Sequence, residues 1–360
     1  DGIRNAIPGE VVIKGDTRSY APEVQALLEQ RMRALCEGIA RAHGAAGAFV
    51  SKWVIDKSTL KVIKGEDLIK RVMLATGGTW SQASGIAAAM NRLCSADLPS
   101  RKAFYRAANR FGSKARIFMN GEEGGVEGRA FAHVASGRDA GSSYELPALG
   151  KAAWENIVAS PYSKNKTVTV GLDDGQGGQV YVYVGKKSRK GNDVQRAGLT
   201  GGMLYGVKVD GLSAESTATT LASVRGFAPI PGAEAMTGAQ LDAKSVELGV
   251  TSFARPEDGS WSRKDARSFY FNTTGSFTGV TRNWHLSFDN PLNVTDGGVI
   301  DIVVAGAENP SGAADAAGPR MLDNLTTTGR GQLILQEDPG NQAYIAGVYR
   351  AKPSASGPVA

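Results

Sequence analysis

Short runs of alternating apolar and polar residues follow residue 44, and they limit the fold more than any other feature. They are rich in β-branched and aromatic residues, end at Gly, Asn or Asp, and lie at 48–55, 115–119, 166–170, 179–184, 267–271, 283–288, 299–304 and 332–335. The 46 glycines, against 14 prolines, suit tight turns between strands. Only brief patches favour helix, at 65–74, 85–92 and 100–108. The pattern predicts an all-β chain of sheets in series, for which a β-propeller is the simplest architecture.

Other segments depart from this pattern. The first 44 residues predict a strand at 5–16 and an amphipathic helix at 22–42, which begins at Pro22. Segments 213–240 and 306–319 are poor in strand formers and are expected to be insertion loops. We therefore expect a strand-helix segment at 1–44, a β-propeller at 45–350 and a disordered tail at 351–360.

Composition excludes several classes of protein. Hydrophobic residues make up 42% of the chain and charged residues 21%, which is typical of a globular domain. The 41 basic residues are spread among 35 acidic ones, so we expect no nucleic-acid partner. No apolar run reaches about 18 residues, so no membrane span is predicted. Cys36 and Cys94 form no CxxC pair, which argues against a disulfide framework or a zinc site.

Acidic pairs are the feature that points to chemistry. Glu122–Glu123, Asp173–Asp174 and Glu337–Asp338 each follow a predicted strand, and Glu257–Asp258 follows Arg255 and Pro256. Adjacent carboxylates repel unless a cation compensates, and the strand exits of a propeller converge on one axis. Calcium binds carboxylate and amide oxygens, so we predict a centre with several calcium ions. Its candidate ligands are Glu122, Glu123, Asp173, Glu257, Asp323, Asn324, Glu337 and Asp338. The alternative is that such acid–Gly pairs are only solvated turns.

Arg255 is a separate candidate. Its guanidinium could pair with the neighbouring carboxylates, or it could present a bidentate fork to a phosphate held at the metal ions. The sequence alone leaves both roles open.

Four motifs, in order, resemble the PhoX-type alkaline phosphatase family from about residue 45 to residue 349. They are GAFVSKWVIDK at 47–57, NGEEGGVEGRAF at 120–131, RPEDGSW at 255–261, and DNL at 323–325 with QEDPGN at 336–341. The resemblance implies a calcium-dependent propeller phosphatase, periplasmic or secreted, that acts on phosphate monoesters. It also implies that Glu122 or Glu123, Glu257, Asp323 and Asp338 are metal ligands and that Arg255 contacts the phosphate.

Iron is a further implication of this resemblance, since well-understood members hold iron through a cysteine in their N-terminal part. Cys94, within Leu-Cys-Ser-Ala-Asp-Leu-Pro at 93–99, does not match the context of that cysteine. The sequence therefore predicts calcium and leaves iron open.

The first 44 residues resemble a different family, the dimerisation-domain segment of aminoacylase and carbamoylase zinc hydrolases. This segment lacks the dizinc core of that family, so no amide hydrolysis is expected from it. The junction near 41–46 is what a fusion, a rearrangement or an assembly artefact would produce. The chain stops soon after Tyr349, which leaves open whether the ring closes. Unpaired strand edges would then favour self-association.

Two functions remain as hypotheses. The first is a metal-dependent hydrolase of phosphate monoesters, with phosphorylated small molecules as its partners. The alternative is a non-catalytic, calcium-stabilised propeller that acts as a binding or scaffold module.

Overall fold

The structure is a computed structural model. It describes residues 69–219, 222–224, 226–312, 318–340, 342 and 345–353, together with Leu27, Gln30, Arg31, Ala34, 55–56 and 61–62. The chain divides into two compact units, residues 1–56 with 61–66 and residues 57–60 with 67–360.

In the first unit, β1 (Ile55–Asp56) pairs with β2 (Lys61–Val62) in antiparallel fashion. Leu27, Gln30, Arg31 and Ala34 are helical, in agreement with the helix predicted at 22–42. The strand predicted at 5–16 and most of the run at 48–55 lie outside the described residues, as does the tail after residue 353. Ala351, which the prediction placed in that tail, belongs to a strand.

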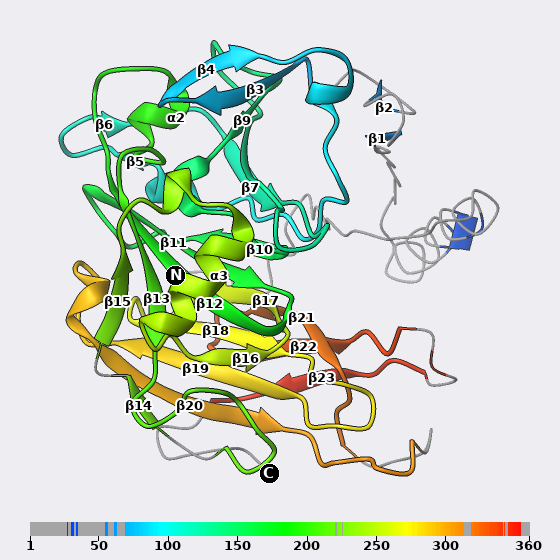
Figure 1. The fold of residues 1–360 in the computed structure, drawn as a ribbon. Coiled ribbons are helices and arrows are strands. Elements are labelled where there is room, and N and C mark those ends of the chain that lie inside the picture. The colour runs from blue at the N-terminus through cyan, green and yellow to red at the C-terminus, as the bar shows by residue number, and fades with distance from the viewer. Residues whose placement is uncertain are drawn as a thin grey trace, which may run out of the picture. The chain divides into compact units, whose positions relative to one another are not determined.

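The second unit consists of mostly antiparallel sheets in succession, an all-β, propeller-like fold as predicted (Figure 1). The first sheet has the order β4 (Thr79–Gln82), β3 (Arg71–Thr76), β9 (Ser142–Glu145), β8 (Ala130–Val134) and β7 (Ile117–Gly121). The second has the order β10 (Trp154–Ala159), β11 (Lys166–Asp173), β12 (Gln176–Lys186), β13 (Met203–Lys208) and β15 (Gly226–Ile230), with β16 (Ser252–Ala254) also paired to β12.

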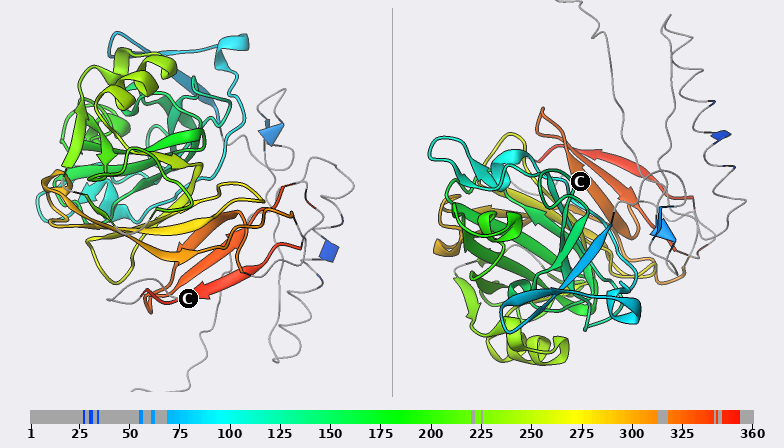
Figure 2. Two further views of the ribbon diagram at one scale, coloured as in Figure 1. Left: turned by 60° about the horizontal axis from the view of Figure 1, so that its bottom comes forward. Right: turned by 90° about the horizontal axis from the view of Figure 1, so that it is seen from above.

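Two more sheets complete this succession. The third has the order β14 (Ala222–Val224), β20 (Gly298–Ala305), β19 (Arg282–Phe288), β18 (Ser268–Thr273) and β17 (Pro256–Trp261). The fourth has the order β21 (Leu322–Thr327), β22 (Leu333–Glu337) and β23 (Val348–Ala351). Figure 2 shows these sheets from two further sides, from the cyan and green strands to the orange and red ones.

Short elements fill the connections. They are the hairpin β5 (Tyr105–Arg106) and β6 (Phe111–Gly112), the helices α2 (Asp193–Arg196) and α3 (Gly238–Glu247), and the 3-10 turns η1 (Gly85–Ala88), η2 (Arg101–Ala103), η3 (Pro147–Leu149), η4 (Ala233–Ala235) and η5 (Val294–Asp296). A capping box at Thr237 and Gln240 starts α3.

One strand of each sheet contacts the next sheet. β7 lies against β10, β10 against β17, and β17 against β21. Aromatic side chains fill the space between the second and third sheets, where the Phe253 ring stands edge-on to Phe271 at 5.3 Å and to Trp284 at 5.6 Å between centroids. This core packs the second sheet, which contains β10, against the third sheet, which contains β17; we call β7, β10, β17 and β21 the four inner strands.

Some element predictions were wrong. Segment 213–240, expected to be a loop, contains β14, β15 and the start of α3. β15 pairs with β13 and buries Phe227 and Ile230, so tertiary pairing makes a strand of a segment with weak local preference. The patch at 65–74, expected to be helical, contains the start of β3, which pairs with β4 and β9.

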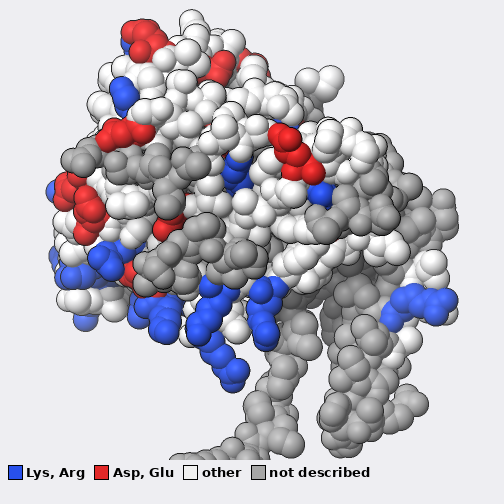
Figure 3. Space-filling model, turned by 90° about the horizontal axis from the view of Figure 1, so that it is seen from below, with Lys and Arg blue, Asp and Glu red and all other residues white. Residues whose placement is uncertain are grey.

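The surface of the described residues is unevenly charged. Seen from below, Lys and Arg side chains gather along one edge of the molecule, while acidic groups lie elsewhere on that face (Figure 3). No described helix has the length and apolarity needed to cross a membrane.

Candidate metal centre

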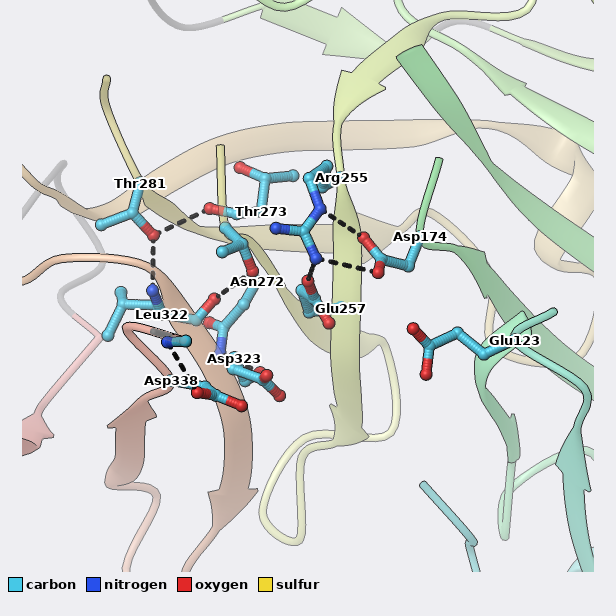
Figure 4. A network of polar contacts seen from close by, with 12 residues as sticks. Glu123, Asp174, Arg255, Glu257, Asn272, Thr273, Thr281, Leu322, Asp323 and Asp338 are labelled. Carbon is cyan, nitrogen blue, oxygen red and sulfur yellow. Dashed lines mark hydrogen bonds and ion pairs between the residues drawn. The ribbon is translucent and has the colours of Figure 1, made fainter. Parts of the chain in front are cut away.

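Each of the four inner strands contributes one carboxylate, within the strand or just after it, to two groups of side chains that share Glu155. Glu123 follows β7, Glu155 lies in β10, Glu257 in β17 and Asp323 in β21. Ligand atoms of Glu155, Glu257 and Asp323 all lie within 4.8 Å of one another. The same is true of Cys94, Glu123 and Glu155, so Glu155 belongs to both groups. Figure 4 shows the Glu123, Glu257 and Asp323 side chains with Arg255 and Asp174. We call these five residues (Cys94, Glu123, Glu155, Glu257 and Asp323) the acidic centre.

The backbone of β7 positions Cys94. Its N–H donates to the carbonyl of Gly121 at 3.2 Å, and Leu93 forms a bridge with Glu122. The segment around Cys94 therefore runs along the end of β7, which brings the thiol beside Glu123. Cys94 is buried, and Glu123 forms an ion pair with Arg92.

Glu155 owes its position to the backbone of β10 next to Trp154. The indole of Trp154 fills space that two glycines leave open, since a Cβ at Gly121 or Gly171 would lie 2.4 or 2.5 Å from Trp154 atoms. Trp154 pairs with Asp173 and Asn156 with Leu172, so Glu155 is the extra residue of a β-bulge, which bends β10 and redirects the Glu155 side chain. Glu155 is itself only 2% exposed.

Arg255 joins the second and third sheets through ion pairs. Its Nε donates to Oδ1 of Asp174 at 2.8 Å, and its Nη2 donates to Oδ2 of Asp174 at 2.9 Å and to Oε1 of Glu257 at 3.0 Å (Figure 4). Its Nη1 donates to none of the residues that the structure describes. Arg255 also has a φ of 62°, a left-handed conformation that costs a non-glycine residue roughly 1 kcal/mol or more and is concentrated at functional sites.

Burial and neighbouring negative charges both act on Glu257. Burial, followed by the charges of Asp323, Glu155 and Asp174, raises the pKa of Glu257 well above its usual value, while Arg255 acts in the opposite direction. A single guanidinium therefore faces an excess of buried carboxylates, and a bound cation would relieve the repulsion.

Glu122 and Asp173, both predicted as ligands, make other contacts. The Glu122 carboxylate accepts hydrogen bonds from Nε and Nη2 of Arg129, at 2.8 and 2.6 Å, and from the Asn91 N–H at 2.7 Å. Burial alone would raise the pKa of Glu122, but these hydrogen bonds outweigh it and lower the pKa. Asp173 accepts from the Ala153 N–H at 3.0 Å, and burial raises its pKa to about 7.

The three remaining predicted ligands lie around β21 and β22. Glu337 accepts hydrogen bonds from the N–H of Gly347 at 2.6 Å and the hydroxyl of Tyr349 at 3.1 Å. Asp338 is exposed and accepts from the Gly340 N–H at 3.0 Å, within a turn. The Asn324 amide donates to Asp323 and so supports a residue of the acidic centre. Of the predicted ligands, the structure thus brings Glu257 and Asp323 together beside Arg255, places Glu123 next to Glu155, and gives the other carboxylates local partners.

Sequence reasoning missed three residues here. Glu155 stands in an ordinary strand sequence with no acidic neighbour, so no local signal marks it. Cys94 was set aside because its flanking residues matched no known context. Asp174 was overlooked beside Asp173, although the alternation of a strand already implies that only one of two adjacent residues faces a given site.

The donor set fits metal ions. Carboxylate oxygens on Glu155, Glu257 and Asp323 suit a hard cation such as calcium. A thiol together with the carboxylates of Glu123 and Glu155 suits a transition metal such as iron.

A scan of the sequence against protein-family models and a search of curated proteins find no match. A search of solved structures does find matches. Pseudomonas fluorescens PhoX in complex with vanadate, a transition state analogue, superposes with a TM-score of 0.51 at 15% identity, over 79% of this chain and 68% of that one. The chain shares the PhoX fold. A putative 6-phosphogluconolactonase from Bacteroides uniformis ATCC 8492 gives a TM-score of only 0.27 at 12% identity, over 73% of this chain and 74% of that one. The likeness to PhoX supports a distant structural relationship, which is coarser than the family membership that the sequence motifs implied.

Proposed function

We propose that this protein is a metal-dependent hydrolase of phosphate monoesters. The observation that carries the proposal is the convergence of Glu123, Glu155, Glu257 and Asp323 from four inner strands beside Arg255. The PhoX structure with the same fold holds vanadate, described as a transition state analogue. Transition-state analogues bind where an enzyme stabilises charge on the reacting group.

Glu155, Glu257 and Asp323 would hold calcium, while Cys94, Glu123 and Glu155 would hold iron. Such ions, when bound, draw electron density from phosphoryl oxygens and offset the charge that develops in the transition state. Glu155 is a member of both groups, so it would couple the two sites, and its loss should affect both metals.

Arg255 would orient the phosphate. Asp174 and Glu257 fix the plane of its guanidinium through Nε and Nη2, which leaves Nη1 to donate to a phosphoryl oxygen. Lysine cannot reproduce this planar, held fork, so Arg255→Lys should lose most of the activity while keeping the positive charge.

Turnover of p-nitrophenyl phosphate tests the proposal. We expect hydrolysis that a chelator abolishes and that added calcium and iron restore. Glu155→Gln and Arg255→Lys should each lower kcat/KM by about 100-fold or more, as removal of a transition-state contact does in other enzymes. Glu234→Gln, which removes one exposed carboxylate elsewhere, is the matched control and should leave kcat/KM unchanged.

Elemental analysis separates the metal assignments. Cys94→Ser should lower the iron content and leave the calcium content unchanged. Turnover that persists in full after chelation would contradict the metal mechanism. Absence of turnover in the metal-loaded protein, with a calcium-dependent rise in melting temperature, would favour the non-catalytic module instead. The periplasmic or secreted location and self-association through strand edges stay predictions.

A further inference from the structure

A second polar site lies at the opposite end of β7 from the acidic centre. It is a pocket of about 670 Å³ formed by the β5–β6 hairpin, the residues that precede β7, the residues that follow β8, and α2 with the loop before it. Lys114 precedes β7 and Glu123 follows it, and the five residues of β7 alone span about 16 Å at ~3.3 Å each. The pocket is therefore separate from the acidic centre.

Positive charge dominates the pocket lining. Five cationic side chains line it against a single carboxylate, which is an excess of four positive charges: Arg110, Lys114, Arg138, Arg189 and Arg196 against Asp193. That carboxylate already has partners, because Asp193 accepts hydrogen bonds from the Ser113 hydroxyl and from Arg196. Like charges that line one pocket repel one another, and a bound anion would offset this repulsion.

Contacts with the hairpin hold two of these cations in place. The Arg189 guanidinium lies over the Phe111 ring, 4.9 Å from its centroid, and Nη2 of Arg189 donates to the Asn109 carbonyl at 2.7 Å. Lys114 Nζ lies 5.6 Å from the centroid of the Tyr105 ring. Cation–π contacts leave the N–H donors at the edge of a guanidinium able to bind a ligand. The site is thus partly ordered before any ligand arrives.

Of these five cations, only Arg196 has an acidic partner among the described residues, and the other four are exposed. Arg138 is exposed and makes no ion pair or hydrogen bond with the residues that the structure describes. Arg110 is exposed too and has a φ of 57°, a conformation that costs a non-glycine residue roughly 1 kcal/mol or more. Mutual repulsion would favour a wider spacing of these cations on a surface that binds only water, whereas an anion-binding site requires them to lie near one another.

We propose that this pocket binds a small anion that carries several phosphate charges, of the size of a triphosphate. The volume is that of small-molecule sites, which range from roughly 300 to 1,000 Å³. Arginine forks match phosphate oxygens in bidentate fashion, and a multivalent anion can offset several of the four excess charges at once. The inference does not rest on the proposed phosphatase activity.

Isothermal titration calorimetry with inorganic triphosphate is the test. We expect one site per chain, with affinity at least tenfold higher for triphosphate than for inorganic phosphate or sulfate. Arg138→Ala with Arg189→Ala should weaken triphosphate binding at least tenfold. The matched control is Arg263→Ala with Lys264→Ala, which removes the same charge from an exposed loop outside the pocket and should leave affinity unchanged.

Triphosphate can also bind metal ions, so the titration is repeated with Asp323→Asn, a variant of the acidic centre. Binding that survives in Asp323→Asn but is lost in the pocket variant supports the proposal. Equal affinity in the pocket and control variants, or equal affinity for triphosphate and inorganic phosphate, would overturn it. Arg138→Glu provides a second variant at an exposed position with no described contacts, and it should weaken binding further than Arg138→Ala.

Discussion

Replacement of Arg255 by leucine tests the electrostatic account of the acidic centre. The change removes three charge-assisted hydrogen bonds and leaves the carboxylates of Asp174 and Glu257, 6% and 2% exposed, without their cation. Removal of one partner of a buried ion pair costs about 3–5 kcal/mol. Because the Arg255 side chain is itself 28% exposed, we expect the lower end, about 3 kcal/mol of unfolding free energy at pH 8.

The loss of unfolding free energy in Arg255→Leu should depend on pH. The pKa of Glu257 is already raised, and loss of Arg255, which lowers it, should raise it further. A carboxyl group whose folded pKa lies above its unfolded value stabilises the fold at low pH and loses that contribution as pH rises through the folded pKa. The deficit of the variant should therefore be about 1 kcal/mol at pH 5 and grow to about 3 kcal/mol at pH 8.

Urea unfolding at pH 5 and pH 8, with chelator and with calcium, measures the difference in unfolding free energy between the variant and the original protein. Calcium should recover part of the loss at pH 8, because a cation that binds only the folded state stabilises it. The control is Arg267→Leu, which breaks an exposed pair with Asp265 at 3.6 Å and should cost less than about 0.5 kcal/mol. An equal deficit at pH 5 and pH 8 would refute the reasoning, since it would show that carboxylate repulsion is not the cause.

Three further predictions concern the supports of the fold. Trp154→Ala should lower the unfolding free energy by about 3–5 kcal/mol in urea titrations, since it empties the space between β7 and β11. Glu122→Gln should destabilise the protein at pH 7 and progressively less below pH 4. The hydrogen bonds from Arg129 lower the pKa of Glu122, so the stabilisation they give is lost as pH falls. A loss of unfolding free energy that does not change with pH would contradict this. Burial lowers the pKa of Lys187 to about 7, so stability should rise with pH between about 7 and 10, and Lys187→Met should flatten that slope in thermal melts.

The strands were largely predictable because strand formation has a local signal. The runs at 166–170 and 179–184 correspond to β11 and β12, and the run at 283–288 to β19, with bounds within a few residues. β15 was not predictable, since it becomes a strand through pairing with β13 rather than through its own composition.

For the candidate site, the sequence marked residues that stand beside other acids and missed those that do not. Glu257 and Glu123 were found through their acidic neighbours, and the same logic also selected Glu122 and Glu337, whose charges are satisfied locally. Nothing in the sequence around Glu155 distinguishes it from a solvent-facing strand residue.

The sequence by itself determined the all-β class, the placement of acids near strand ends, and Arg255 next to Glu257. Only the tertiary structure decided which carboxylates meet, because that depends on how β7, β10, β17 and β21 lie against one another. It selected Asp174 rather than Asp173 as the partner of Arg255, and it brought Cys94 and Glu155 to Glu123. The physical reason is that repulsion between carboxylates depends on distance in space, and residues from different sheets become neighbours only when the aromatic core packs those sheets together.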